Sequence, residues 1–105
     1  MYIKYAGILG AAMLLPVQMT ERVVKTEYLA CNPERQFEHA ERLRKSGDNA
    51  ALHAFTQGAL LSGTCVSLAP GSAVFVVGKG KNEAVIRIRP KGSFKIFYTS
   101  ELAFE

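Results

Sequence analysis

The feature that most constrains the fold is an alternation of apolar and basic residues near the C-terminus, within AVIRIRPKGSFKIFYT at 84–99. Successive side chains of a β-strand point to opposite faces of a sheet, so a period of two divides the residues into two sets. Ile86 and Ile88 fall on one face, and Arg87 and Arg89 fall on the other. The pattern therefore predicts a strand with one dry face and one basic face.

A Pro-Lys-Gly-Ser turn interrupts the alternation, and a second apolar run follows it. A three-residue connection at 91–93 would place every branched aliphatic side chain of the hairpin on the dry face, and burial favours that register. The predicted cross-strand pairs are Ile88 with Ile96, Ile86 with Tyr98, Arg89 with Lys95, and Arg87 with Phe97. Because like charges directly opposite destabilise a sheet, the Arg89–Lys95 pair needs open solvent or a counter-charge.

The remainder of the chain divides into a helical part and a strand part. Residues 32–62 predict a helical hairpin, with Asn32 and Asp48 as N-caps, Pro33 in the first turn and Gly47 as the stop between the helices. The predicted apolar stripes are Phe37, Ala40 and Leu43 on the first helix, and Leu52, Phe55 and Ala59 on the second. Residues 63–105 contain four extended runs separated by turn sequences at 69–72, 78–82 and 90–93.

The first 19 residues have the shape of a secretory signal peptide. Lys4 precedes an apolar run over 6–15 that is too short to span a bilayer, and Pro16 follows it. We therefore expect export to the periplasm or the cell exterior, with 20–105 as a single mature domain that has no membrane span. The alternative is a buried strand or helix at the start of a cytoplasmic protein.

The two cysteines, Cys31 and Cys65, are consistent with export. They are widely separated and lack the C-x-x-C spacing of metal or redox sites. In an exported protein we expect them to form one disulfide, whereas in a cytoplasmic protein they would be two buried thiols.

The charge is unevenly distributed along the chain. The formal net charge of the 105 residues is +4; residues 20–65 are balanced, and residues 66–105 carry +3. A basic C-terminal half favours an anionic partner, although a solvated sheet would show the same balance.

Three stretches, SGTCVSLAPGSAVFVV, AVIRIRPKG and FYTSELAF, resemble the bacterial SH3-like domains of exported proteins. Residues 46–104 resemble small secreted bacterial proteins that pair a helical hairpin with such a domain. The resemblance implies an α+β fold in which an N-terminal helical hairpin packs on a small SH3-like antiparallel β-barrel at 63–105. It also implies a groove lined with aromatic residues, for which Phe75, Phe97 and Tyr98 are the matching residue types.

Catalytic chemistry has little support in the sequence. A nucleophile, base and orienting group could be assembled from Cys65, either His39 or His53, and Asp48, but a disulfide would block the thiol. The spacing of the cysteines and histidines matches no zinc motif, and the glycines and lysines at 78–82 lack phosphate-loop spacing. We therefore expect no enzyme activity, no catalytic residue, no metal and no cofactor.

We expect the chain to be a non-enzymatic exported module that binds a protein or an envelope polymer. One alternative is a cytoplasmic SH3-like nucleic-acid-binding protein, because Lys79, Lys81, Lys91 and three other basic residues are interleaved with Phe94 and Phe97. Another is a small inhibitor or immunity protein of an envelope hydrolase. The basic side of the sheet is most simply a solvated face; if it binds a partner, the candidate residues are Phe75, Arg87, Arg89, Lys95, Phe97 and Tyr98.

Overall fold

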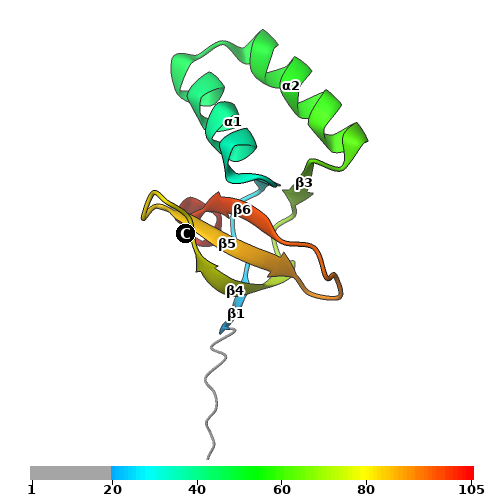
Figure 1. Ribbon diagram of the computed structural model, residues 1–105, viewed down its shortest axis with the longest axis vertical. Coiled ribbons are helices and arrows are strands. Elements are labelled where there is room, and N and C mark those ends of the chain that lie inside the picture. The colour runs from blue at the N-terminus through cyan, green and yellow to red at the C-terminus, as the bar shows by residue number, and fades with distance from the viewer. Residues whose placement is uncertain (1–19) are drawn as a thin grey trace, which may run out of the picture.

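The computed structural model describes residues 20–105, so the predicted signal peptide at 1–19 lies outside the described residues. Six strands and two helices form one α+β unit (Figure 1). The elements are β1 Thr20–Val23, β2 Tyr28–Cys31, α1 Glu34–Ser46, α2 Asn49–Ser62, β3 Cys65–Leu68, β4 Ala73–Lys79, β5 Val85–Pro90, β6 Phe97–Ser100 and a short 3-10 helix, η1, Glu101–Phe104. Within this part of the chain, neither helix combines the length and the apolar character needed to cross a membrane.

The six strands form one open antiparallel sheet, and the predicted SH3-like barrel is wrong. The strand order is β1-β4-β5-β6-β2-β3, so β1 and β3 each have a single hydrogen-bonded neighbour and form the two edges. A barrel would require its edge strands to pair with each other. Instead β3 and β4, which are consecutive in the chain, belong to separate parts of the sheet.

The barrel prediction failed because residues 20–31 contribute two strands that the sequence pattern did not reveal. β1 pairs with β4 along its whole length. β2 inserts between β3 and β6, so the C-terminal strands alone cannot complete the sheet. The helical hairpin consequently lies between β2 and β3 rather than at the N-terminus of the domain, and it projects from one side of the sheet (Figure 1).

The helix boundaries follow the predicted signals closely. Gly47 ends α1 in the left-handed conformation with φ of 79°, which glycine adopts at little cost. Asp48 caps α2, because its side chain accepts a hydrogen bond of 3.0 Å from the backbone N–H of Ala51. The predicted N-cap of α1 is wrong. Pro33 occupies that position, and the side chain of Asn32 instead donates to a backbone carbonyl in the loop before β6.

The register of β5 and β6 differs by one residue from the predicted register. Ile88 pairs with Phe97 rather than with Ile96. The connection runs from 91 to 96 instead of 91 to 93, because the chain continues beyond the Pro-Lys-Gly-Ser turn before β6 begins. A shift of one residue reverses every side chain of a strand. Phe97 and Thr99 therefore face the core, and Tyr98 faces the opposite side.

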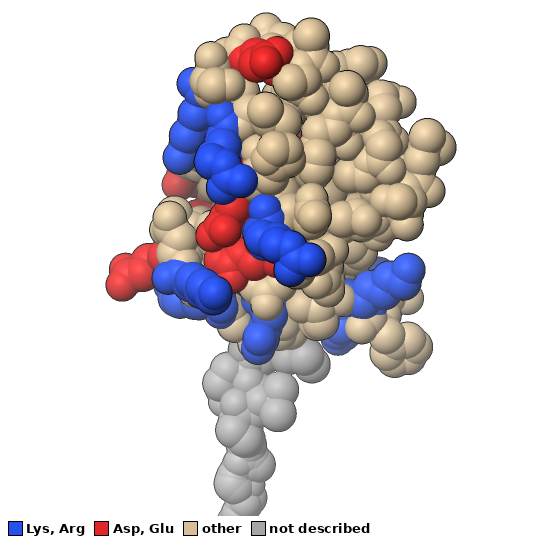
Figure 2. All heavy atoms as spheres, turned by 45° about the horizontal axis from the view of Figure 1, so that its top comes forward, with Lys and Arg blue, Asp and Glu red and all other residues tan. Residues whose placement is uncertain are grey.

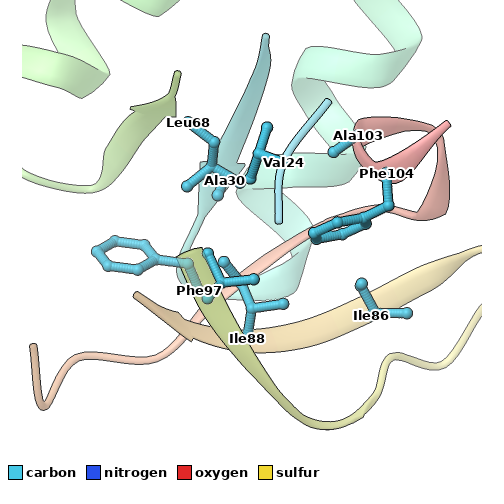
Figure 3. Close-up of a cluster of buried hydrophobic side chains, with 9 residues drawn as sticks. Val24, Ala30, Leu68, Ile86, Ile88, Phe97, Ala103 and Phe104 are labelled. Carbon is cyan, nitrogen blue, oxygen red and sulfur yellow. The ribbon is translucent and has the colours of Figure 1, made fainter. Parts of the chain in front are cut away.

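The main core lies on one side of the curved sheet, which we call the inner face. Ile86 and Ile88 are almost fully buried there, as the alternation predicted. η1 closes this core at the C-terminus with Ala103 and Phe104 (Figure 3). The buried residues of this main core are Val24, Ala30, Leu68, Val74, Ile86, Ile88, Phe97, Ala103 and Phe104.

A second buried cluster lies between the opposite, outer face of the sheet and the helices. Phe37 of α1 and Ala59 of α2 pack there against Val85 and the two cysteines. Cys31 and Cys65 are cross-strand partners on β2 and β3 and form a disulfide, which confirms the predicted pairing. The bond joins the strand that enters the helical hairpin to the strand that leaves it.

We expect that removal of this disulfide lowers the free energy of unfolding by roughly 3–4 kcal/mol, because the link closes a chain segment with a sequence separation of 34. Urea unfolding of oxidised wild type and of a Cys31→Ala/Cys65→Ala variant measures the difference. Wild type with its disulfide reduced is the control and should resemble the variant. Equal stability of oxidised wild type and the variant would contradict the expectation.

The observed register predicts unequal costs for two adjacent substitutions. Phe97→Ala should lower the free energy of unfolding by about 3–5 kcal/mol, because Phe97 is only 4% exposed in the core. Ile96→Ala should cost only about 1 kcal/mol, because Ile96 precedes the strand and is half-buried. Chemical denaturation of both variants tests this order, and the reverse order would favour the register predicted from the sequence.

Candidate binding surface

The outer face of the sheet has a covered part and an open part. The helices cover β2, β3 and the nearby residues of β5 and β6. Farther along β5, toward Pro90, the outer side chains Arg87 and Arg89 are half-buried rather than enclosed, and Phe75 on the neighbouring β4 is half-buried too. We call Phe75, Arg87 and Arg89 the arginine face.

Arg89 is held in place by an aromatic ring and by the loop that follows its strand. Phe75 is its cross-strand partner on β4, and the guanidinium carbon lies 4.8 Å from the centroid of the Phe75 ring. Its Nη1 also donates a hydrogen bond of 2.8 Å to the backbone carbonyl of Ser93. Stacking of this kind orients a guanidinium.

Arg87 lies against an irregularity in β4. The pairing of β4 with β5 shifts between Val76 and Gly78, which places an extra residue, Val77, in β4. Arg87 Nη2 donates a hydrogen bond of 3.3 Å to the carbonyl of Val77. A Cβ atom on Gly78 would lie 2.8 Å from the same nitrogen, so glycine at this position lets the guanidinium lie directly on the backbone.

The structure brings together only part of the predicted binding set. Phe75, Arg87 and Arg89 are neighbours on the open part of the outer face. Tyr98 pairs with Arg87 across β5 and β6, at the border with the helix-covered cluster. Lys95 is exposed in the loop before β6, and Phe97 points into the core, where a partner at the surface cannot contact it.

The register also removes the like-charge pair that the sequence suggested. Arg89 does not oppose Lys95, because the pairing of β5 with β6 ends at Ile88 and Phe97. The predicted Arg89–Lys95 pair is therefore wrong, and the condition placed on that pair, open solvent or a counter-charge, does not apply. An aromatic ring and a backbone carbonyl contact this guanidinium.

A second group of polar side chains lies where α1 meets β2. Tyr28 donates a hydrogen bond of 3.2 Å to Glu41 and accepts one of 2.8 Å from Arg44. Arg44 and Glu41 also form an ion pair of 2.6 Å. Burial raises the pKa of the Tyr28 phenol above its ordinary value, and the nearby carboxylate of Glu41 raises it further. This group links α1 to β2.

The charged surface of α1 is mixed in sign. A hollow of about 360 Å³ beside α1 has Glu38, Glu41, Arg42 and Lys45 in its lining. On the side shown in Figure 2, basic and acidic side chains lie close together in one region, and most of the remaining surface is uncharged. Mixed charges of this kind match the solvated salt-bridge surface expected for an amphipathic helix and give no single-sign pocket.

Three of the residues considered for catalysis, Cys65, Asp48 and His39, have structural partners. The sulfur of Cys65 is bonded to Cys31, and Asp48 caps α2. The ring of His39 packs edge-on against Phe55 with 5.0 Å between centroids, so it joins the two helices. Within residues 20–105, no group of three or more His, Cys, Asp or Glu side chains is placed to hold a metal ion.

Comparison of the chain with protein-family models, with curated proteins and with solved structures finds no significant match. The arginine face therefore has to be interpreted from its own geometry. Its three residues belong to the predicted binding set, but no sequence pattern indicated the role of Gly78. The position of this glycine beneath Arg87 depends on the irregularity in β4, which no local pattern predicts.

Titration of the tyrosines should detect the environment of Tyr28. Because its pKa is raised, one phenol should deprotonate later than an ordinary tyrosine, and this late step should disappear in Tyr28→Phe. A group with a raised folded-state pKa stabilises the fold at low pH and loses that contribution as pH rises, here above about pH 10. Absorbance at alkaline pH and urea unfolding across the same range measure both effects.

Tyr98→Phe is the matched control, because it also removes a phenol from the sheet but leaves the Glu41 and Arg44 contacts of Tyr28 intact. It should retain the late step. Loss of the late step in Tyr98→Phe, with retention in Tyr28→Phe, would contradict the assignment.

Proposed function

We propose that this protein is an exported, non-enzymatic module that binds an anionic partner, either a protein segment or an envelope polymer, through the arginine face. The observation that carries the proposal is the fixed position of the two guanidinium groups. Each is held by a backbone carbonyl, and Arg89 is also stacked on Phe75. Side chains that are already oriented lose less conformational entropy when a ligand binds them.

The spacing of the two arginines suits a repeating anionic ligand. Residues two apart on a strand project from the same face and are separated by about 6.5–7 Å. Arg87 and Arg89 have this relation on β5. A guanidinium binds a carboxylate or phosphate in a bidentate manner, so two of them in a row suit an extended chain that carries such groups in series. Tyr98, beside Arg87, extends the same surface toward the helices.

The disulfide supports the compartment in this proposal. Disulfides persist in oxidising locations such as the periplasm and the cell exterior, and they are rare in reducing cytoplasm. Cys31 and Cys65 are 0% and 1% exposed, which suits a structural bond rather than a catalytic one. The disulfide weighs against the nucleic-acid alternative, because that alternative places the protein in the cytoplasm. The geometry alone does not separate the two, since an arginine face with an aromatic residue also suits a single-stranded nucleic acid.

Cell fractionation tests the compartment directly. In cells of the native host quenched with acid, both cysteines should resist alkylation until a reductant is added, and the protein should fractionate with the periplasm or the medium. Mass spectrometry of the alkylated peptides provides the measurement. Recovery in the cytoplasm with both thiols free would overturn the exported assignment.

Binding to defined anionic probes tests the arginine face. The oxidised protein should co-sediment with isolated cell-wall sacculi or bind poly-glutamate, and Arg87→Ser/Arg89→Ser should weaken that binding at least about ten-fold, because two charge-assisted contacts are lost. The same substitutions remove the hydrogen bonds to Val77 and Ser93 and the ring contact with Phe75, so a stability cost of about 1–2 kcal/mol is expected and the fold must be verified.

Arg35→Ser/Arg42→Ser is the matched control. It removes the same net charge from exposed positions on α1 and should weaken binding far less. Equal loss in both double variants would show that binding depends only on net charge. Failure of the wild type to bind either probe would refute the proposed function, and tighter binding to a single-stranded oligonucleotide at the same salt concentration would favour the nucleic-acid alternative.

A further inference from the structure

The loop between β5 and β6 exposes a large aromatic side chain almost completely. Phe94 is 97% exposed, whereas the other phenylalanines named above are buried or half-buried. Single apolar residues at a surface are common, but a fully exposed ring leaves an unusually large apolar area in water. If the loop has a defined shape, the exposed ring of Phe94 marks a candidate contact site.

Several hydrogen bonds define that shape. The N–H of Ser93 donates to the carbonyl of Pro90 at 3.0 Å, and the N–H of Lys95 donates to the Ser93 hydroxyl at 3.0 Å. Arg89 donates to the Ser93 carbonyl. At the far end, the side chain of Asn32 donates to the carbonyl of Ile96 at 2.9 Å. The loop is thus fixed at both ends and in the middle, and Phe94 lies between these attachments.

Basic side chains flank the exposed ring. Lys91 and Lys95 lie on either side of Phe94, both exposed, and residues 90–96 include no acidic residue. Lys91 contacts Glu21 at 3.4 Å, but their side chains are 60% and 45% exposed, so the pair is weak and easily exchanged. The loop consequently combines one apolar ring with two accessible positive charges.

A second exposed apolar side chain lies at the same end of the sheet. Val23 is 50% exposed and pairs with Ala73 across β1 and β4. The carbonyl of Ala73 in turn accepts a hydrogen bond of 3.1 Å from the N–H of Lys91. Val23 and Lys91 therefore both neighbour Ala73, so an exposed apolar side chain and a basic side chain lie together at this end of the sheet.

We propose that residues 90–96 form a contact site for an anionic lipid surface. Phe94 enters the boundary between headgroups and acyl chains, and Lys91 and Lys95 bind the headgroup phosphates. This arrangement of an apolar ring between basic side chains matches the requirements of interfacial membrane binding. A protein pocket that bound Phe94 would need a surrounding rim that excludes water, whereas the neighbours of Phe94 here are cationic and solvated.

The inference goes beyond the proposed function, because it concerns a different surface and a different partner. Binding through this loop would orient the protein at a membrane and leave the arginine face on β4 and β5 for its own ligand. The two sites share Arg89, which supports the loop, so Arg87 is the residue whose substitution separates them.

Tryptophan fluorescence provides a direct test, because the chain contains no Trp. In the full-length Phe94→Trp variant the new indole should be the only one, and its emission should shift to the blue when vesicles of phosphatidylglycerol and phosphatidylcholine are added. Brominated acyl chains should quench it. Leu61→Trp is the matched control, because Leu61 is 88% exposed on α2, a helix without charged residues, and its indole should report no change.

Affinity measurements complete the test. Lys91→Ser and Lys95→Ser should each weaken vesicle binding about five-fold, and 0.5 M salt should weaken it further. Phe94→Ala should weaken it about ten-fold or more. Arg87→Ser should bind vesicles as wild type does, even where it no longer binds sacculi or poly-glutamate, so failure of one proposal is distinguishable from failure of the other.

Three results would overturn the inference. The first is an identical spectral response of Phe94→Trp and Leu61→Trp. The second is equal binding to vesicles with and without phosphatidylglycerol, which would exclude a role for the lysines. The third is a blue shift produced by a purified host protein but not by vesicles, which would identify a protein pocket as the site for Phe94.

Discussion

The structure depends on the position of β2 in the sheet. Tyr28–Cys31 pairs with β3 on one side and with β6 on the other, so a strand of four residues joins the two parts of the sheet. Its side chains alternate between two buried clusters, with Ala30 in the main core and Cys31 beneath the helices. Because β2 also leads into α1, the same strand fixes the helical hairpin to the outer face.

The helical hairpin determines which part of the sheet remains open. α1 and α2 bury Val85 and contact Tyr98, which lie at one end of the outer face. Beyond them the alternation of β5 continues, and Arg87 and Arg89 emerge where neither α1 nor α2 covers the strand. The boundary between a buried cluster and the arginine face is therefore set by the length and position of the hairpin, and the disulfide holds that hairpin at its base.

Several local features could be predicted because their causes are local. The pleat of a strand places Ile86 and Ile88 on one face of β5 and the two arginines on the other. Gly47 and Asp48 each act within one turn of the helix that they end or cap. The register of β6 could not be predicted in the same way. Both registers bury apolar residues, and the choice between Ile96 and Phe97 depends on the length of a loop whose far end is fixed by Asn32.

The sequence by itself determined the helical hairpin, the two faces of β5 and the pairing of two distant cysteines. Each of these rests on periodicity, capping or count, which operate over a few residues or on the whole composition. Only the tertiary structure decided that the sheet is open, that β1 and β2 belong to it, and that Phe97 is core while Phe94 is exposed. These outcomes depend on contacts between segments far apart in the chain, such as the hydrogen bond from the Thr99 hydroxyl to the carbonyl of Leu29, which spans 70 residues. No local pattern specifies which distant strand completes a sheet.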